Sequence, residues 1–371
     1  MGARLNSTLL PRRLVVILQR GGMDGLHAVP PVDDPHWRAC RPTLSAAEDW
    51  HALAPGLGLH PALLPLLPLW EAGELAVLPA IATRYRRRSH FEAQNMLESG
   101  GAAPYVVDTG WLNRALDHLG TGAHGLSLDT VQPLILRGAA AVHAAVPGGT
   151  GRTETDVLER LDALFAPDPL FHQAYRRSPL HEAALKAARQ AGSRPRRLDP
   201  VDMARAAASR MAAPGGPHGV VIELSGWDTH QAQAHVMRRG LAELGAVVLS
   251  LRDGLGDHWQ HTAVIAVSEF GRTVAENGTR GTDHGTGGLA LVAGGTVRGG
   301  RSVGAWGSLR PDALLEGRDV RPTLAMAGLL KAVLRDHFGL AQGVVDADIL
   351  PSLAESAAID GLFVPPGSDA V

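Results

Sequence analysis

Short runs of β-branched and aliphatic residues alternate along this chain with longer stretches whose apolar residues follow a helical pattern. Such an alternation is typical of βα units, which build a mostly parallel sheet covered by helices on both faces. The runs that we interpret as strands span residues 13–18, 75–81, 134–136, 220–224, 262–267 and 289–293. The chain is therefore predicted to adopt an α/β fold.

One buried helix is predicted between the fourth and fifth of these runs. Apolar residues repeat there at alternating steps of three and four, at Leu241, Leu244, Val248, Leu251 and Leu255. This spacing places them on one face of a helix. We expect this helix to cross over one face of the sheet between two strands.

The length of 371 residues is consistent with one large α/β unit, or with a main domain that carries a smaller cap. Residues 154–213 have a helical pattern, are interrupted by prolines and contain no strand pattern, so they are a candidate for an inserted helical cap. The Pro- and Gly-rich end, residues 362–371, is predicted to be a loose tail. We otherwise interpret residues 1–371 as a single domain.

The composition limits the partners that we expect. Hydrophobic residues make up 45% and charged residues 19% of the chain, which is typical of a globular protein. The net charge of -2 provides no global positive field, so neither nucleic acid nor an anionic membrane is an expected partner. The single cysteine, Cys40, forms no disulfide within the chain and no thiolate cluster for zinc.

The apolar run near the start, residues 14–18, is too short for the core of a signal peptide or for a membrane span. The sequence as written therefore predicts a cytoplasmic protein. A start codon further upstream would make a periplasmic or exported protein the alternative. The sequence predicts no particular oligomeric state.

Polar residues follow several of the predicted strands, and ligands of open parallel sheets bind beyond the carboxyl ends of strands. Asp24 follows the first strand in a Gly-rich turn, where it is a candidate metal ligand or the acceptor of an Asx-turn. Asp228 and His230 follow the fourth strand, and residues i and i+2 of an extended stretch point the same way, so both can reach one cation. The alternative for this pair is a helix N-cap at Asp228 with His230 on the surface.

Three more candidate ligands lie after the fifth strand. Glu269 follows this strand directly, and Asp283 and His284 lie side by side in a Gly-rich loop before the last strand. Carboxylate oxygens and imidazole nitrogens are common ligands of divalent metals. A structural turn would explain Asp283 and its glycines but not His284. We therefore predict all three as metal ligands.

The segment 84–90 follows the second strand and precedes a predicted helix. Ser89, with Glu92 three residues later, fits a capping box, so a helix N-cap is one interpretation of this serine. The free amides of a helix start also bind phosphate or sulfate, so Ser89 is equally a candidate nucleophile or anion contact. His90 is a candidate metal ligand or proton-transfer group. The arginines that we predict to bind the anion are Arg20, Arg88 and Arg272.

Seven short motifs occur in order along nearly the whole chain, at residues 20–26, 58–62, 88–91, 110–113, 226–230, 268–273 and 282–285. With these motifs the chain resembles the bacterial family known as domain of unknown function 1501, which is itself similar to alkaline phosphatases and sulfatases. The resemblance implies an alkaline-phosphatase-like three-layer sandwich, with helices on both faces of the sheet.

The resemblance also implies a pair of divalent metal ions, often zinc. We expect one or two ions in this chain, with zinc as the first choice and manganese or calcium as alternatives. In the superfamily such ions hold an oxyanion while a Ser or Thr attacks phosphorus or sulfur. Ser89 corresponds to that nucleophile. The positions that correspond to metal ligands are Asp24, Asp228, His230, Glu269 and His284.

Two functional hypotheses follow. The first is a metal-dependent hydrolase of phosphate or sulfate esters, acting on a small-molecule or carbohydrate substrate. The alternative is a non-catalytic protein that keeps the fold, has a degraded metal site and binds a polyanionic or carbohydrate ligand. Phe270 and Thr286 favour the alternative, because related proteins are expected to carry histidines at these positions.

Overall fold

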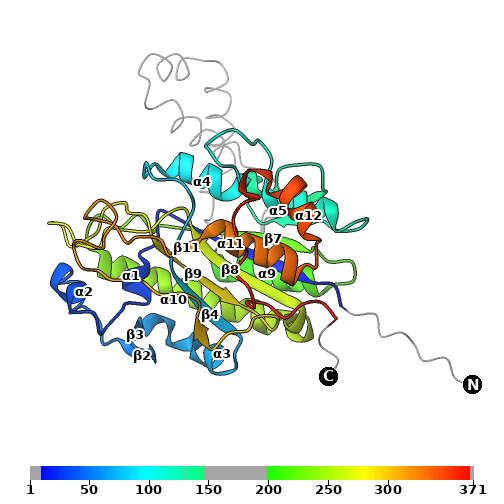
Figure 1. The fold of residues 1–371 in the computed structure, drawn as a ribbon. Helices are drawn as coiled ribbons and strands as arrows, with labels where there is room; N and C mark the ends of the chain where they lie inside the picture. Colours follow the sequence, from blue (N-terminus) through cyan, green and yellow to red (C-terminus); the bar gives the residue numbers. More distant parts are fainter. Residues whose placement is uncertain (1–9, 130, 146–198, 368–371) are drawn as a thin grey trace, which may run out of the picture.

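The structure is a computed structural model that describes residues 10–129, 131–145 and 199–367. Its centre is a nine-stranded sheet with the order β10-β4-β9-β8-β1-β7-β5-β6, and β11 pairs with β4 (Figure 1). Strand β9 runs antiparallel to β4 and β8, whereas the other strand pairs of this sheet are parallel. The predicted α/β fold with a mostly parallel sheet is confirmed. The strands are β1 (Arg13–Arg20), β4 (Leu75–Ala82), β5 (Gly125–Ser127), β6 (Val142–Ala144), β7 (Gly219–Ser225), β8 (Thr262–Ser268), β9 (Gly288–Ala293), β10 (Arg301–Ser302) and β11 (Leu324–Ala325).

Helices cover both faces of the sheet, and a small antiparallel hairpin, β2 (His51–Ala54) and β3 (Leu57–Leu59), lies outside it. None of the helices in the described ranges combines the length and the apolar character that a membrane span requires. The α-helices are α1 (Gly25–Ala28), α2 (Pro35–Cys40), α3 (Leu67–Glu71), α4 (His90–Ser99), α5 (Trp111–His118), α9 (Pro200–Ala212), α10 (Gln233–Leu255), α11 (Met326–Ala332) and α12 (Gln342–Val344).

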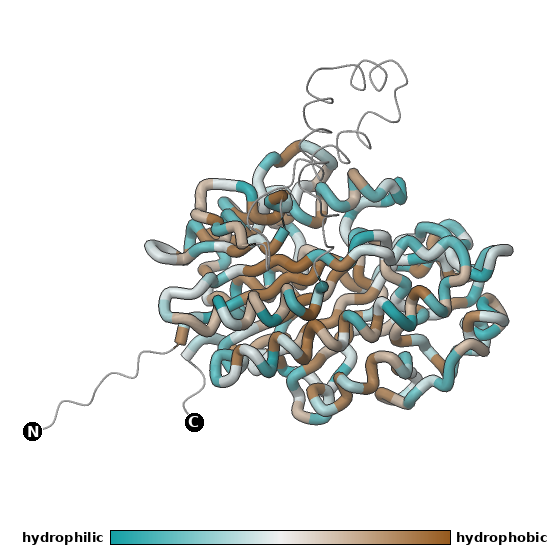
Figure 2. Tube along the Cα trace, turned by 180° about the vertical axis from the view of Figure 1, so that it is seen from behind, coloured by the Kyte–Doolittle hydropathy of each residue, from teal (hydrophilic) through white to brown (hydrophobic). Residues whose placement is uncertain are grey.

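The central strand β1 shows how the two hydrophobic cores form. Because successive side chains of a strand point to opposite faces, Val15 and Ile17 join the core under α9 and α10, whereas Leu14 and Val16 join the core under α5 and α11. Figure 1 shows α4 and α5 above the sheet and α10 below it, and Figure 2 shows the hydrophobic strands enclosed between the two helical layers. The predicted crossover helix is α10, which connects β7 to β8 by way of the short helical segment Gly256–His261.

Parallel pairing in the middle of the sheet brings three loops together. Strand β1 pairs with β7 on one side and with β8 on the other. At its carboxyl end, Gln19 lies opposite Ser268, and Arg20 lies opposite Ser225. The loops that follow these three strands therefore start side by side at one edge of the sheet.

One predicted strand is wrong. Residues Leu134–Leu136 form a 3-10 turn rather than a strand, and Ile135 and Leu136 are buried in the core beside α5. The apolar run is only three residues long and begins after Pro133, which has no N–H to donate to a ladder. Two short strands at this end of the sheet, β5 and the edge strand β6, have three residues each and were not predicted, since they contain no longer apolar run.

The predicted cap and tail lie only partly within the described residues. Most of the predicted insertion 154–213 lies outside the described residues, but its end forms α9, which packs between β7 and α10 with Ala204 and Ala208 buried. This helix belongs to the helical layer and is not part of a cap. The predicted loose tail begins with Leu362 and Phe363, which are both buried in the core, so its start is held in place.

Candidate metal centre

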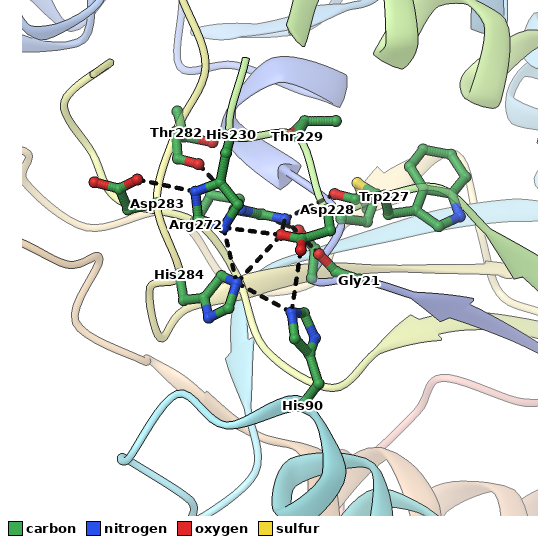
Figure 3. Close-up of polar contacts among 12 residues, drawn as sticks. Gly21, His90, Trp227, Asp228, Thr229, His230, Arg272, Thr282, Asp283 and His284 are labelled. Carbon is green, nitrogen blue, oxygen red and sulfur yellow. Dashed lines mark hydrogen bonds and ion pairs between the residues drawn. The ribbon is translucent and has the colours of Figure 1, made fainter. Parts of the chain in front are cut away.

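The candidate site lies at the carboxyl edge of the sheet, where residues from the loops after β4, β7 and β8 meet (Figure 3). Asp228 and His230 lie in the loop after β7, and Glu269 directly follows β8. His90 is the first residue of α4, which follows β4, and His284 lies in the loop before β9. The parallel register of the central strands brings these distant parts of the sequence together.

Three imidazole rings and one carboxylate converge at this place (Figure 3). The Nε2 atom of His284 is 3.0 Å from Nε2 of His90 and 3.1 Å from Nε2 of His230. Oxygens of Asp228 lie 3.1 Å from Nε2 of His230, 3.2 Å from Nε2 of His284 and 3.6 Å from Nε2 of His90. This place is a candidate metal centre, and its four residues, His90, Asp228, His230 and His284, are called the metal centre below.

The other ring nitrogen of each histidine is next to a hydrogen-bond acceptor. Nδ1 of His90 is 2.8 Å from a Glu269 carboxylate oxygen, and Nδ1 of His230 is 3.0 Å from an Asp283 carboxylate oxygen. Nδ1 of His284 is 2.9 Å from the carbonyl oxygen of Arg88. A neutral ring that donates a hydrogen bond through Nδ1 has its lone pair on Nε2. In that tautomer, Nε2 of His284 presents a lone pair to Nε2 of His90 and to Nε2 of His230. Nε2 of His230 and Nε2 of His284 also lie within hydrogen-bond distance of Asp228.

This arrangement fits a cation. Facing lone pairs repel one another, and three adjacent imidazolium ions would repel one another as well, so a positive ion between the rings stabilises them. Four ligands of a tetrahedral zinc ion, each about 2.0–2.1 Å from the metal, are about 3.3 Å apart. Five of the six pairs among these residues are 3.0–3.6 Å apart, and the ligand atoms of His90, Asp228 and His284 all lie within 4.8 Å of one another. Burial, together with the neighbouring His90 and Arg272, lowers the pKa of His284, which keeps this ring neutral at pH 7.

Glu269 is an outer partner of the metal centre rather than one of its four converging residues. It is buried, and one of its oxygens accepts hydrogen bonds from His90, from Gln94 at 3.0 Å and from the backbone N–H of Gly21 at 2.8 Å. Burial alone would raise the pKa of Glu269, but these hydrogen bonds, above all the one from His90, hold it below its ordinary value. An ionised carboxylate behind a histidine fixes the ring and makes it a better ligand.

Asp283 has the same relation to His230. Its side chain is half exposed, and the same oxygen that faces His230 accepts a hydrogen bond from Asn277 at 3.2 Å. The hydrogen bonds from Asn277 and His230 lower the pKa of Asp283, which is therefore an anion at neutral pH. The structure thus places Glu269 and Asp283 behind the ring nitrogens that face away from the centre.

Asp24, also predicted as a ligand, is saturated by other partners. Both of its oxygens accept hydrogen bonds from Arg41, at 2.7 and 3.1 Å, and one accepts a further bond from Gln233 at 2.6 Å. The carboxylate is fully buried. Burial alone would raise the pKa of Asp24, but the charge and hydrogen bonds of Arg41 outweigh this effect and lower it. Asp24 therefore stabilises the turn after β1 and is not brought to the metal centre.

The three arginines predicted to bind an anion are all engaged within the protein. Arg20 pairs with Glu223 at 2.7 Å and with Glu98 at 2.6 Å. The fully buried guanidinium of Arg272 is 2.5 Å from Asp228 and donates to several backbone carbonyl oxygens of the surrounding loops. Arg88 pairs with two carboxylates, described below. None of the three is free to bind a substrate, in contrast to the prediction.

Arg272 also acts on the charge of the centre. Burial would raise the pKa of Asp228, but the hydrogen bond and positive charge of Arg272 lower it, so Asp228 is ionised. The side chain of Asp228 remains 46% exposed. One of the four converging residues is therefore accessible to solvent.

Ser89 precedes α4 but does not cap it. Its side chain accepts no bond from the helix, and Glu92 bonds to the hydroxyl of Tyr85 instead of reaching back to Ser89. The same Tyr85 hydroxyl accepts the backbone N–H of Ser89 at 3.3 Å. The capping-box interpretation is therefore wrong, because Tyr85 takes the place of the direct contact. The Ser89 hydroxyl is left without a capping role one residue before His90.

Phe270 packs against the metal centre. Its ring centroid is 4.9 Å from those of both His90 and His284. It excludes water from one side of these rings. Gln94, another partner that was not predicted, lies one helical turn after His90, and this i,i+4 spacing is the signal that could have found it. Nothing in the sequence marks Asn277 or Arg41 as partners of predicted ligands.

A second group of histidines and a carboxylate, His27, Glu48 and His60, lies away from the metal centre and is called the buried cluster below. One ligand-type atom from each residue lies within 4.8 Å of the others. His60 precedes the short helical segment Pro61–Leu66, and its Nδ1 accepts the backbone N–H of Ala62 at 3.0 Å. Its Nε2 is 3.4 Å from Glu48, which also pairs with Arg238 at 2.7 Å.

Comparison with known proteins gives one family and several weak structural similarities. A sequence model of a family described as "Protein of unknown function (DUF1501)" matches residues 80–349, more than half of the chain. No curated protein matches the sequence significantly.

The structural similarities include proteins from three bacteria. A Bacteroides thetaiotaomicron protein, described in connection with the metabolism of multiple glycosaminoglycans, is 10% identical, with 97% of this chain and 78% of that chain covered and a TM-score of 0.43. A protein in the alkaline phosphatase superfamily from Vibrio parahaemolyticus is 11% identical, with 78% and 65% covered and a TM-score of 0.34. The C-terminal periplasmic domain of EcEptC from Escherichia coli, in complex with Zn, is 10% identical, with 78% and 74% covered and a TM-score of 0.33. At this level, similarity indicates neither a substrate nor a mechanism for this chain.

Proposed function

The chain belongs to the family described as "Protein of unknown function (DUF1501)", and we propose that this member is a hydrolase of phosphate or sulfate esters that depends on one divalent metal ion. The observation that carries this proposal is the convergence of three Nε2 atoms and the Asp228 carboxylate, in which five of the six pairs are 3.0–3.6 Å apart. Three nitrogens and one oxygen suit zinc better than calcium, which prefers a shell of oxygens. Manganese is the second choice, since it accepts both kinds of ligand.

The four residues of the metal centre would hold the ion, and their outer partners prepare them for this. Glu269, Asp283 and the Arg88 carbonyl oxygen hold each ring in the tautomer that directs its lone pair inward. A divalent ion bound here would neutralise charge on a phosphoryl or sulfuryl group and would lower the pKa of a hydroxyl beside it.

Ser89 is the hydroxyl that we assign to this chemistry. It directly precedes α4, whose first backbone N–H groups are available to an anion, and its side chain has no capping role. Its neighbour His90 belongs to the metal centre, so both residues are positioned by the same helix start. We propose Ser89 as the nucleophile and His90 as a metal ligand rather than a proton-transfer group.

One ion, rather than the pair implied by the family resemblance, is what the carboxylates can hold. Asp24 is saturated by Arg41, Gln233 and a backbone N–H. Glu269 is buried and accepts hydrogen bonds from His90, Gln94, Ser268 and Gly21. Neither carboxylate retains the free oxygen that a second ion would need.

Metal content and chelation test this proposal. We expect the purified full chain to contain, or to bind on addition, about one zinc ion per chain, and to cleave p-nitrophenyl phosphate or p-nitrophenyl sulfate. A chelator should abolish the activity and zinc should restore it. In Ser89→Ala the activity should be lost while zinc is retained. A chain that binds no zinc or manganese, or that hydrolyses these esters equally well after chelation, contradicts the proposal.

The alternative is a non-catalytic binding protein with the same fold, and one observation favours it. Arg20, Arg88 and Arg272, the arginines predicted to bind the anion, are all occupied by acidic partners. On this alternative the chain binds metal and an anionic ligand without turnover, and Ser89→Ala leaves the binding of that ligand unchanged. Zinc-dependent ester cleavage by the parent chain rules it out.

A further inference from the structure

Arg88 lies directly before Ser89 and His90, and its backbone conformation is unusual for its residue type. Its φ angle is +61°, in the left-handed region that a bulky residue rarely adopts. Such a conformation persists only where the surrounding contacts hold it, and it often occurs at functional sites. The contacts of Arg88 must therefore hold this conformation.

Two carboxylates hold the side chain of Arg88. Its Nε and Nη2 atoms lie 2.9 and 2.8 Å from the same oxygen of Asp319, and Nη2 lies 2.6 Å from Glu316. Asp319 is completely buried, whereas the side chain of Glu316 is 61% exposed. An exposed ion pair is screened by water and contributes little, so Asp319 is the partner that fixes the arginine.

The backbone of Arg88 in turn fixes His284. Its carbonyl oxygen accepts the hydrogen bond from Nδ1 of His284, which leaves the lone pair of this ring on Nε2. Asp319 also reaches the loop of His284 directly, because the oxygen that pairs with Arg88 accepts a hydrogen bond from Thr286 at 2.8 Å. Asp319 thus holds both Arg88, whose carbonyl oxygen accepts the hydrogen bond from His284, and the loop that carries His284.

We infer that Asp319 is a positioning residue of the metal centre, which sets the tautomer and orientation of His284 through the backbone of Arg88 and through Thr286. The inference rests on the proposed function only in treating His284 as a metal ligand. It also assigns a role to Thr286, which stands where relatives were expected to carry a histidine, and to Arg88, which is not free to bind an anion.

Two matched variants of the full chain test the inference by zinc affinity, measured in competition with a chromophoric chelator. Asp319→Asn keeps the size of the side chain and removes its charge, and we expect it to weaken zinc binding about 10- to 100-fold, as outer partners of metal ligands typically do. Glu316→Gln removes the other, exposed partner of Arg88 and should change affinity less than about fivefold. Equal losses in both variants, or no loss in Asp319→Asn, would overturn the inference.

A second readout separates a positioning role from general loss of structure. Nitrogen-15 NMR of the histidine rings in the metal-free chain should show His284 as the Nδ1–H tautomer in the parent and in Glu316→Gln, and a mixture of tautomers in Asp319→Asn. An unchanged His284 spectrum in Asp319→Asn overturns the inference. If the parent chain binds no zinc at all, the proposed function fails, but this spectrum still decides the role of Asp319.

If Asp319→Asn does not unfold cooperatively, a milder variant tests the inference in its place. Thr286→Val removes only the hydroxyl that donates to Asp319. We expect a smaller loss of zinc affinity in the same direction, and the appearance of the second His284 tautomer. A parent-like affinity together with a parent-like spectrum would then count against the inference.

Discussion

The metal centre and the buried cluster contain the same kinds of side chain but differ in what their ring nitrogens contact. In the metal centre, each Nδ1 faces an acceptor, so the Nε2 lone pairs point inward. In the buried cluster, Nδ1 of His60 is itself an acceptor, because it receives the N–H of Ala62. The proton of a neutral His60 ring is then on Nε2, which faces Glu48 and has no lone pair for a cation.

The surroundings of the two groups also favour metal binding at the metal centre and not at the buried cluster. Glu48 is already paired with Arg238, and the rings of His27 and His60 pack against Trp50 at 5.3 and 5.5 Å. Asp228 of the metal centre, by contrast, is partly open to solvent. The partner of the second ring nitrogen, rather than the types of residue, therefore distinguishes a metal site from a structural cluster.

Removal of one converging ligand should give the largest difference between the two groups. In His284→Ala we expect the zinc content to fall to background, because the ring that contacts all three other members of the metal centre is lost. In His60→Gln the zinc content should stay at the parent value. Elemental analysis after dialysis measures both. Zinc retained by His284→Ala but lost from His60→Gln would reverse the assignment of the two groups.

The free energy of unfolding should respond in the opposite way, with a larger loss from the buried cluster than from the metal centre. His27 is 1% exposed and packs among aromatic rings, so His27→Ala leaves a cavity and should cost about 2–4 kcal/mol of unfolding free energy. The side chain of His230 is 42% exposed, and His230→Ala should change the stability of the metal-free chain by no more than about 0.5 kcal/mol. Urea unfolding in the presence of a chelator measures both values. Similar costs for the two variants would contradict the division into a structural and a metal-binding group.

The pH dependence of stability sharpens the same comparison. Burial lowers the pKa of His27 to about 3, whereas the unfolded chain binds this proton with a pKa of about 6.5. The folded chain stays neutral at His27 as the pH falls from 6.5 towards 3, so the unfolded state is progressively favoured in this range. The stability that the neutral ring contributes is thus present above pH 6.5 and is lost below it.

From pH 7 to pH 5 the unfolding free energy of the parent should therefore fall by about 2 kcal/mol more than that of His27→Gln, in which residue 27 has no proton to gain. His337, whose pKa burial also lowers to about 3, is present in both chains and cancels from the difference. Urea unfolding at the two pH values gives the comparison. Equal pH dependence of the two chains would show that His27 is not held in its neutral form.

More of the fold than of the candidate site could be predicted from the sequence. Strands such as β1 and β8 are continuous apolar runs, and the spacing of Leu241 to Leu255 marks α10, because a parallel sheet buries both faces of its strands. Short strands of three residues, such as β5, have no comparable pattern. Local patterns thus predict central elements and miss marginal ones.

In the site, the residues that follow strand ends were identified, but their partners were not. The structure brings His90, Asp228, His230 and His284 together, as was expected of ligands at one sheet edge. Asp24 follows a strand in the same way, yet it meets Arg41, which lies in a loop that no pattern connects to it. A carboxylate looks the same in sequence whether it faces a guanidinium or a metal, so ligand and outer partner can be separated only by tertiary structure.

The smallest effect should come from the most exposed outer partner of the metal centre. Asp283→Asn keeps an oxygen that accepts the hydrogen bond from Nδ1 of His230 but removes the negative charge behind the ring. Because the Asp283 side chain is 50% exposed, solvent already screens that charge, and we expect zinc affinity to fall by about tenfold at most. In Glu269→Gln the zinc affinity should fall further, by up to about 100-fold, because the Glu269 carboxylate of the parent is 1% exposed behind His90. Competition with a chromophoric chelator gives both affinities. A larger loss in Asp283→Asn than in Glu269→Gln would mean that Asp283 binds the ion directly, and the metal centre would then include a second carboxylate.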